Sequence, residues 1–197
     1  MEKVIGRAGL WLALVTAVPL VTGCPVGGGP KVASPLNGQY RYTCCNMRYE
    51  KPEITDVNYT QGTLLPYGTR VQILEVKKNA IRFQPEGHPE MTLVYRHGRK
   101  IYPFEQYLDR IFLVENPKKG MATTGKKKAA AGSKFAKQIE NGLVEPGMTK
   151  DEVLKTLGYP PAHRTASIES PIWTYWRNRW ETYTVYFDGD RVDRISR

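Results

Sequence analysis

The chain has 197 residues, of which 41% are hydrophobic, 11% aromatic and 24% charged. This length leaves room for one large domain or two small ones and excludes a longer array of domains. The formal net charge is +10 at pH 7, and residues 115–132, with five lysines and one glutamate, supply the largest share of it. The surplus positive charge therefore lies in a predicted linker, and the predicted folded parts are nearly balanced.

The first 23 residues are typical of an export signal. Lys3 and Arg7 give a basic start, and the apolar run Ala8–Val21 follows. This run is shorter than the roughly 20 residues that a membrane-spanning helix needs, but it has the length of a signal-peptide core. The chain is therefore expected to leave the cytoplasm, which disfavours nucleic acid as a partner.

The run Val21-Thr22-Gly23-Cys24 resembles a bacterial lipobox. That resemblance implies cleavage before Cys24, acylation of the Cys24 thiol and acylation of the new amino terminus. At about 0.8 kcal/mol per buried CH₂ group, these acyl chains would hold the protein on a membrane. Pro25, in place of an aspartate, points by the same resemblance to the outer membrane, with the protein facing the periplasm. An ordinary cleaved secretory signal and an uncleaved anchor are the alternatives.

Residues 24–36 are rich in glycine and proline, which predicts a flexible tether. Residues 37–114 predict a small β-rich domain, because apolar and polar residues alternate in several short runs. We expect strands at residues 40–47, 70–77, 80–83 and 91–95, and a turn at 64–68. Helical spacing of apolar residues predicts a closing helix through Phe104, Tyr107, Leu108 and Ile111. The run G-T-L-L-P-Y-G-T-R-V-Q-I-L, residues 62–74, is similar to the turn and strand of SH3-like barrels.

Residues 115–132 form a low-complexity basic segment. Its composition predicts a solvated linker between two folded parts. The alternative is electrostatic contact with anionic lipid or lipopolysaccharide, because each lysine near a charged membrane surface contributes about 1 kcal/mol.

Residues 133–197 begin with two predicted helices. Thr149 and Glu152 have the spacing of a capping box, and Gly158 supplies the left-handed position that ends the second helix. The first helix is expected between Ser133, as its cap, and Gly142. Alternating aromatic residues then predict three antiparallel strands at 172–178, 180–187 and 191–195, with a hairpin turn at 188–190.

Two sequence motifs accompany this order of elements. The predicted helices contain I-E-N-G-x-x-x-P-G-M-T-K-D-E-V-L-K-T-L-G-Y-P, and the predicted strands contain W-T-Y-W and V-Y-F-D-G-D-R-V. Together they resemble the BamE family, also called SmpA/OmlA, over about residues 133–197. The resemblance implies a module of two helices packed on a three-stranded antiparallel sheet. Together with the small SH3-like β-rich domain predicted before it, which the family pattern lacks, this gives an α+β fold. The resemblance also implies a scaffold role, without catalysis, in the machinery that inserts β-barrel proteins into the outer membrane.

The aromatic residues of the last strands are the candidate binding residues. Ile172, Thr174 and Trp176 share one face, and Trp173 and Tyr175 share the other. Two helices cover only one face of the sheet, so some aromatic rings are left for a partner or for the other domain. Trp, Tyr and Arg are enriched at binding hot spots, which selects Trp173, Tyr175, Trp176, Arg177 and Trp180. Packing within the chain is the alternative.

The remaining cysteines and histidines do not predict an enzyme. A disulfide between Cys44 and Cys45 is disfavoured, because neighbours on a strand point to opposite faces. We therefore expect one buried and one exposed thiol there, with an intermolecular disulfide as an alternative. A Cys–His nucleophile using His88 or His97 is a further alternative, although no flanking motif accompanies either histidine. The spacing of Cys, His and acidic residues predicts neither a metal site nor a cofactor.

The sequence therefore predicts an outer-membrane lipoprotein that docks other envelope proteins, with barrel-assembly machinery as the expected partner. The alternative is a lipoprotein that binds peptidoglycan or another envelope component through the SH3-like domain. A hydrolase with a thiol nucleophile is the third hypothesis.

Overall fold

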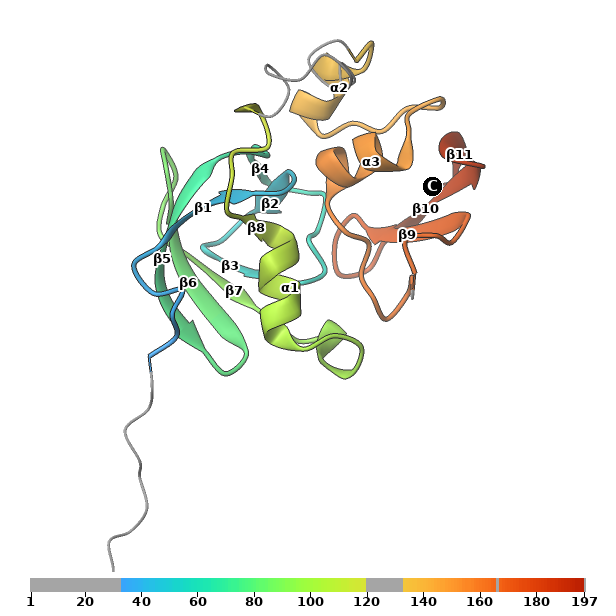
Figure 1. Ribbon diagram of the computed structural model, residues 1–197. Helices are drawn as coiled ribbons and strands as arrows, with labels where there is room; N and C mark the ends of the chain where they lie inside the picture. Colours follow the sequence, from blue (N-terminus) through green and yellow to red (C-terminus); the bar gives the residue numbers. More distant parts are fainter. Residues whose placement is uncertain (1–32, 120–132, 166, 197) are drawn as a thin grey trace, which may run out of the picture. The chain divides into compact units, whose positions relative to one another are not determined.

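The computed structural model describes residues 33–119, 133–165 and 167–196. The predicted signal peptide, the acylation site at Cys24 and most of the predicted tether and basic linker lie outside these residues. The contacts of residues 33–197 group them into one compact unit. This unit has mixed α+β structure, as predicted, and Figure 1 colours it along the sequence. Among the described residues, no helix combines the length and the apolar character needed to cross a bilayer.

The first half of the described chain is built on a curled six-stranded sheet with the order β3-β7-β6-β5-β1-β8. All neighbours in it are antiparallel except β3 and β7, which are parallel. The six strands are β1 Tyr40–Thr43, β3 Glu53–Thr55, β5 Arg70–Lys77, β6 Ala80–Pro85, β7 Met91–Val94 and β8 Phe112–Leu113. Two short strands, β2 Met47–Tyr49 and β4 Thr63–Leu65, pair separately. The strand predicted at 70–77 is confirmed, and those predicted at 80–83 and 91–95 agree with β6 and β7 to within two residues.

The prediction of one strand over residues 40–47 is wrong. The chain leaves the sheet after Thr43, because its next main-chain groups bond to other elements. The Cys44 N–H donates to the carbonyl of Ile111 at 3.0 Å, and the Asn46 N–H donates to that of Lys155 at 2.9 Å. The run is therefore divided into β1 and β2.

The core of this first half lies between the curled sheet and helix α1, Phe104–Ile111. The predicted helical spacing is confirmed: Phe104, Leu108 and Ile111 are buried. Tyr95 stacks on Phe104 and Tyr107, with ring centroids 5.4 and 4.6 Å apart. Leu36, which the prediction placed in the tether, packs against this core.

The second half has two helices and a three-stranded antiparallel sheet, in the predicted order. The elements are α2 Ala136–Asn141, α3 Lys150–Leu157, β9 Ile172–Trp176, β10 Thr182–Asp188 and β11 Arg191–Ser196. Both bonds of the capping box at α3 are present, which confirms that prediction. Ser133 does not cap α2: the residue before that helix is Phe135, and the Ser133 hydroxyl accepts from the Phe135 N–H at 3.0 Å.

One face of the three-stranded sheet is covered by α2 and α3. Trp173, Tyr175, Val185, Phe187 and Val192 point to this side and form a second core with Phe135, Ile139, Met148, Val153 and Leu157. The other face carries Ile172, Thr174 and Trp176 from β9, beside Tyr186, Thr184 and Thr182 of β10. The predicted division of β9 into two faces is confirmed.

Two asparagines join the halves through the carboxyl ends of the helices. The side-chain amide of Asn46 donates to the carbonyls of Ile139 and Thr156, at 2.6 and 3.2 Å, and its oxygen accepts from the Tyr67 N–H at 2.9 Å. The side-chain amide of Asn58 donates to the carbonyl of Leu157 at 2.7 Å. The last carbonyls of a helix have no partner within it, so these bonds satisfy the carbonyls of Thr156 and Leu157 at the end of α3. The Ile139 carbonyl also accepts from the Gly142 N–H at 3.1 Å.

We predict that Asn46→Ala lowers the free energy of unfolding by roughly 2–4 kcal/mol, because it leaves the buried Thr156 carbonyl and the partly buried Tyr67 N–H without their partner and removes one of the two bonds to the Ile139 carbonyl. Urea unfolding monitored by circular dichroism measures this change. Asn141→Ala is the matched control: Asn141 is exposed, and its substitution should change stability by less than about 0.5 kcal/mol. Equal stability of the two variants would contradict the structural role of Asn46.

Candidate functional site

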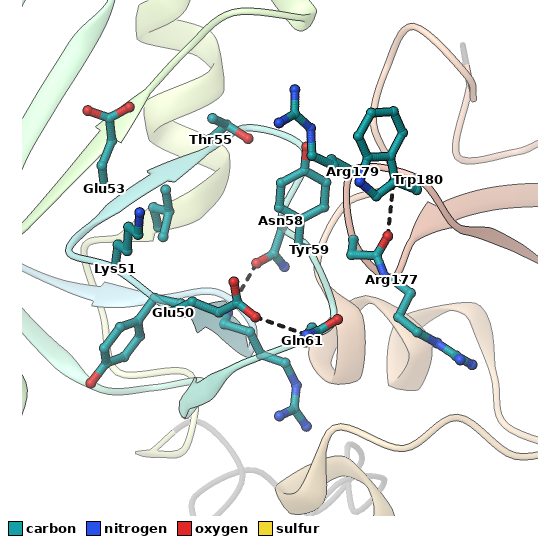
Figure 2. Close-up of a pocket in the computed structure, with 14 residues that line it drawn as sticks. Glu50, Lys51, Glu53, Thr55, Asn58, Tyr59, Gln61, Arg177, Arg179 and Trp180 are labelled. Atoms are coloured by element: carbon teal, nitrogen blue, oxygen red, sulfur yellow. Dashed lines mark hydrogen bonds between the residues drawn. The ribbon is translucent and has the colours of Figure 1, made fainter.

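A groove of about 470 Å³ is the candidate site, and residues from both halves of the described chain line it. One wall comes from β2, β3 and the segment between β3 and β4. The other wall is the turn between β9 and β10, residues 177–180. Figure 2 shows Thr55, Tyr59, Arg179 and Trp180 near one another across the groove.

The β9–β10 turn is held by one side chain. The Asn178 oxygen accepts from the main-chain N–H groups of Trp180 and Glu181 at 2.9 and 3.0 Å, and the Arg177 N–H donates to the carbonyl of Glu181 at 2.8 Å. Asparagine commonly closes turns in this way. The turn therefore presents Trp180 in a fixed place, with 80% of the residue exposed.

The opposite wall is held by Asn58, which has a positive φ of 48°. Its side-chain amide donates to the carbonyl of Asn46 at 3.1 Å, and its oxygen accepts from the Arg48 N–H at 3.3 Å. The Thr60 N–H then donates to the carbonyl of Trp176 at 3.0 Å, which ties this wall to β9. Tyr59, between these two bonded residues, lines the groove.

The groove has an excess of basic side chains. Among the described residues that line it, Arg48, Lys51, Arg177 and Arg179 are basic, and Glu50 and Glu53 are acidic. Glu53 pairs with Arg96, outside the groove, at 3.3 Å. Glu50 accepts from the Gln61 amide at 2.9 Å. Within the described chain, no carboxylate lies within 4.0 Å of Lys51 or Arg179. The arrangement suits an anionic group next to an aromatic surface.

Of the five predicted binding residues, two are buried in the structure and three are at least partly exposed. Trp173 and Tyr175 are fully buried in the second core, and the Tyr175 hydroxyl donates to the carbonyl of Gly158 at 2.9 Å. They cannot form a surface, so their prediction as binding residues is corrected. Arg177 and Trp180 line the groove, and Trp176 is half-buried beside His163.

Sequence reasoning missed Lys51, Asn58 and Tyr59, because nothing in their local pattern indicates that they face the β9–β10 turn.

A second cluster, next to Trp176, contains a carboxylate and two histidines. Asp56 is buried, and its oxygens accept from the main-chain N–H groups of Arg96, His97 and Gly98 at 2.7–3.2 Å. The His97 ring nitrogen Nδ1 lies 3.2 Å from Asp56 Oδ1. The centroids of the His97 and His163 rings are 5.2 Å apart.

Cys44 and Cys45 form a disulfide, which corrects the prediction of two free thiols. That prediction assumed an extended strand, on which neighbouring side chains diverge. Residues 44 and 45 instead lie in the bend between β1 and β2, where the two side chains can meet. The two histidines considered as partners of a thiol have other contacts: Tyr49 for His88, at 3.0 Å, and Asp56 for His97. Among the described residues, no group of three or more His, Cys, Asp or Glu side chains could hold a metal ion.

Comparison with known proteins gives no match: no family model matches the chain, and neither a curated protein nor a solved structure matches it significantly.

The histidine pair leads to a prediction about charge. Partial burial lowers the pKa of His163 from its usual range, and the positive charges of His97 and Arg164 lower it further, while Asp56 acts in the opposite direction. The unfolded chain therefore binds this proton at a higher pH than the folded chain. The free energy of unfolding therefore decreases as the pH falls below the ordinary histidine pKa of about 6.5, because the unfolded chain takes up this proton first.

We predict that His97→Asn raises the pKa of His163 toward that ordinary value. An NMR titration of the His163 ring protons measures it. His88→Asn is the matched control, because His88 is bonded to Tyr49, and it should leave the His163 titration unchanged. A His163 pKa that is the same with and without His97 would contradict the coupling.

Proposed function

We propose that this chain is a lipid-anchored protein of the outer membrane that faces the periplasm and docks other proteins without catalysing a reaction. Its partner in this proposal is the machinery that inserts β-barrel proteins, for which the chain serves as a scaffold or accessory subunit. The anchor is an acylated Cys24, which lies outside the described residues.

The observation that carries the proposal is the exposed Trp180 between Arg177 and Arg179 on a turn with fixed geometry. Large exposed aromatic rings next to arginines are typical of protein–protein hot spots. The Arg179 guanidinium lies 4.9 Å from the Trp180 ring centroid. Trp180 has little part in the cores of the fold, so its exposure on the rim of a groove favours a role in binding.

The order of the elements also supports the proposal. Two helices followed by a three-stranded antiparallel sheet are what a BamE-like module requires, and the curled β-rich first half is compatible with an SH3-like domain. The basic linker, residues 115–132, would add contact with anionic lipid if it lies near the membrane surface.

A second candidate is binding of peptidoglycan. It is favoured by the lining of the groove, because Tyr59 on one wall and Trp180 on the other are aromatic surfaces, and Gln61 and Asn178 are hydrogen-bonding side chains of the same groove. A glycan would use both kinds of group. Sedimentation of the protein with purified sacculi separates the two candidates, because docking of a protein partner predicts no retention on sacculi.

We predict that Trp180→Ala weakens retention of barrel-assembly proteins by at least about tenfold, the effect of losing a hot-spot side chain. The measurement is affinity purification of the full-length chain from gently solubilised outer membranes, with the retained proteins quantified by mass spectrometry. Because Trp180 is exposed, the variant should keep its stability to within about 0.5 kcal/mol.

Tyr40→Ala is the matched control, because Tyr40 is also a large exposed ring, with 50% exposure, but lies on β1 outside the groove. It should retain the same partners as the unchanged chain. Undiminished retention by Trp180→Ala, or no barrel-assembly protein in any of the purifications, would contradict the proposal.

A further inference from the structure

Strand β3 ends the six-stranded sheet, and its free side borders the groove. Within the described residues, β3 pairs only with β7. The Thr92 N–H donates to the carbonyl of Pro52 at 2.8 Å. In a parallel ladder, alternate residues direct their main-chain groups to the same neighbour. The main-chain groups of Ile54 therefore point toward β7, as the carbonyl of Pro52 does. The main-chain groups of Glu53 and Thr55 point away from β7.

This free side keeps several hydrogen-bonding groups for a ligand. The Thr55 carbonyl accepts from the Asn58 N–H at 3.1 Å. Within the part of the chain that the structure describes, the Glu53 N–H, the Glu53 carbonyl and the Thr55 N–H have no hydrogen-bond partner on that side, and both residues line the groove. The Thr55 hydroxyl is also buried and has no hydrogen-bond partner among the described residues. The unused capacity of this edge for hydrogen bonds therefore lies in the main-chain groups of Glu53 and Thr55.

The charges around this edge indicate which ligand would suit it. The only acidic side chain on β3, Glu53, lines the groove but is paired with Arg96, which lies outside it. Glu50, the other acidic lining residue, accepts from the Gln61 amide. Lys51 precedes β3, and Arg177 and Arg179 lie on the opposite wall with Trp180. Arg177 is paired with Glu181 at 3.7 Å, so Lys51 and Arg179 are the basic residues that supply most of the positive charge here. Figure 2 shows Arg179 and Trp180 on the side of the groove toward which the Thr55 hydroxyl points. A ligand there would meet main-chain donors on one side and positive charge with an aromatic ring on the other.

We propose that the groove binds an extended acidic peptide segment of a partner protein as an added strand on the free edge of β3. Addition of a strand to a sheet edge is a common mode of peptide recognition, in which main-chain hydrogen bonds supply affinity and neighbouring side chains supply specificity. This inference rests on the proposed docking function and names the form of the docked segment. A glycan would not match the spacing of main-chain groups along a strand, so the free edge favours a peptide.

The test is an NMR titration of the full-length, isotope-labelled chain in detergent micelles with a terminally blocked octapeptide of alternating aspartate and valine. We expect saturable shifts of the Glu53 and Thr55 amides and of the Trp180 indole N–H, with a dissociation constant below about 1 mM. Binding should weaken as salt is raised, because the arginine contacts are exposed to solvent. The fully N-methylated octapeptide keeps the side chains but lacks main-chain donors, and it should bind at least tenfold more weakly.

Charge is tested with two matched arginine variants. Arg179→Ala should weaken binding of the octapeptide several-fold. Arg194→Ala should leave binding unchanged, because Arg194 is also exposed but lies on β11, outside the groove. An octapeptide with lysine in place of aspartate should not bind.

Three results would overturn the inference: no shift of Glu53 or Thr55 at millimolar octapeptide, equal binding of the N-methylated peptide, or shifts of these residues by soluble peptidoglycan fragments alone. If the octapeptide fails while barrel-assembly proteins are still retained through Trp180, docking stands and strand addition is wrong. If the octapeptide binds but those proteins are not retained, the peptide site stands and the proposed partner is wrong.

Discussion

The structure depends on hydrogen bonds that two asparagines of the β-rich half make to the carboxyl ends of helices in the other half. Each α-helix ends with carbonyls that have no partner within the helix. At α3, the Leu154 carbonyl accepts from Gly158, that of Lys155 from the Asn46 main chain, that of Thr156 from the Asn46 side chain, and that of Leu157 from Asn58. The end of α3 is thus satisfied mostly by residues about 100 positions earlier in the chain.

These bonds hold the two walls of the groove in place relative to each other. Asn58, which bonds to α3, directly precedes Tyr59, and Thr60 bonds to the end of β9. The same strand, β9, leads into the turn that carries Arg177 and Trp180. The positions of the two groove walls are therefore set by one set of polar contacts. Loss of these contacts would separate the residues that line the groove.

Features specified by neighbouring residues could be predicted from the sequence. The capping box of α3 needs only Thr149 and Glu152, and the helical spacing of α1 needs only its own apolar residues. The alternation along β9 predicted its two faces. Which face is buried depends on where α2 and α3 pack, so Trp173 and Tyr175 could not be assigned to the core from the pattern alone.

Features that depend on contacts between distant residues could not be predicted. The strands β2, β3 and β4 have three residues each, which is too short for a pattern of alternation. The bend at Cys44 and Cys45 follows from the bonds that Cys44 and Asn46 make to other elements. The free edge of β3 and its position beside Trp180 are also consequences of packing. For these reasons the sequence indicated the types of residue that bind but only part of their location.

Hydrogen exchange of the Asn46 and Thr60 amides, measured by NMR on the full-length chain, tests the central claim most directly. Both N–H groups donate across the boundary between the halves, to Lys155 and Trp176. If these contacts hold the halves together, both amides should be protected as strongly as the core strand amides of Ile73 and Val185, because all four open only on global unfolding. Exchange of Asn46 and Thr60 at the rate of an unstructured chain, with Ile73 and Val185 still protected, would contradict the account.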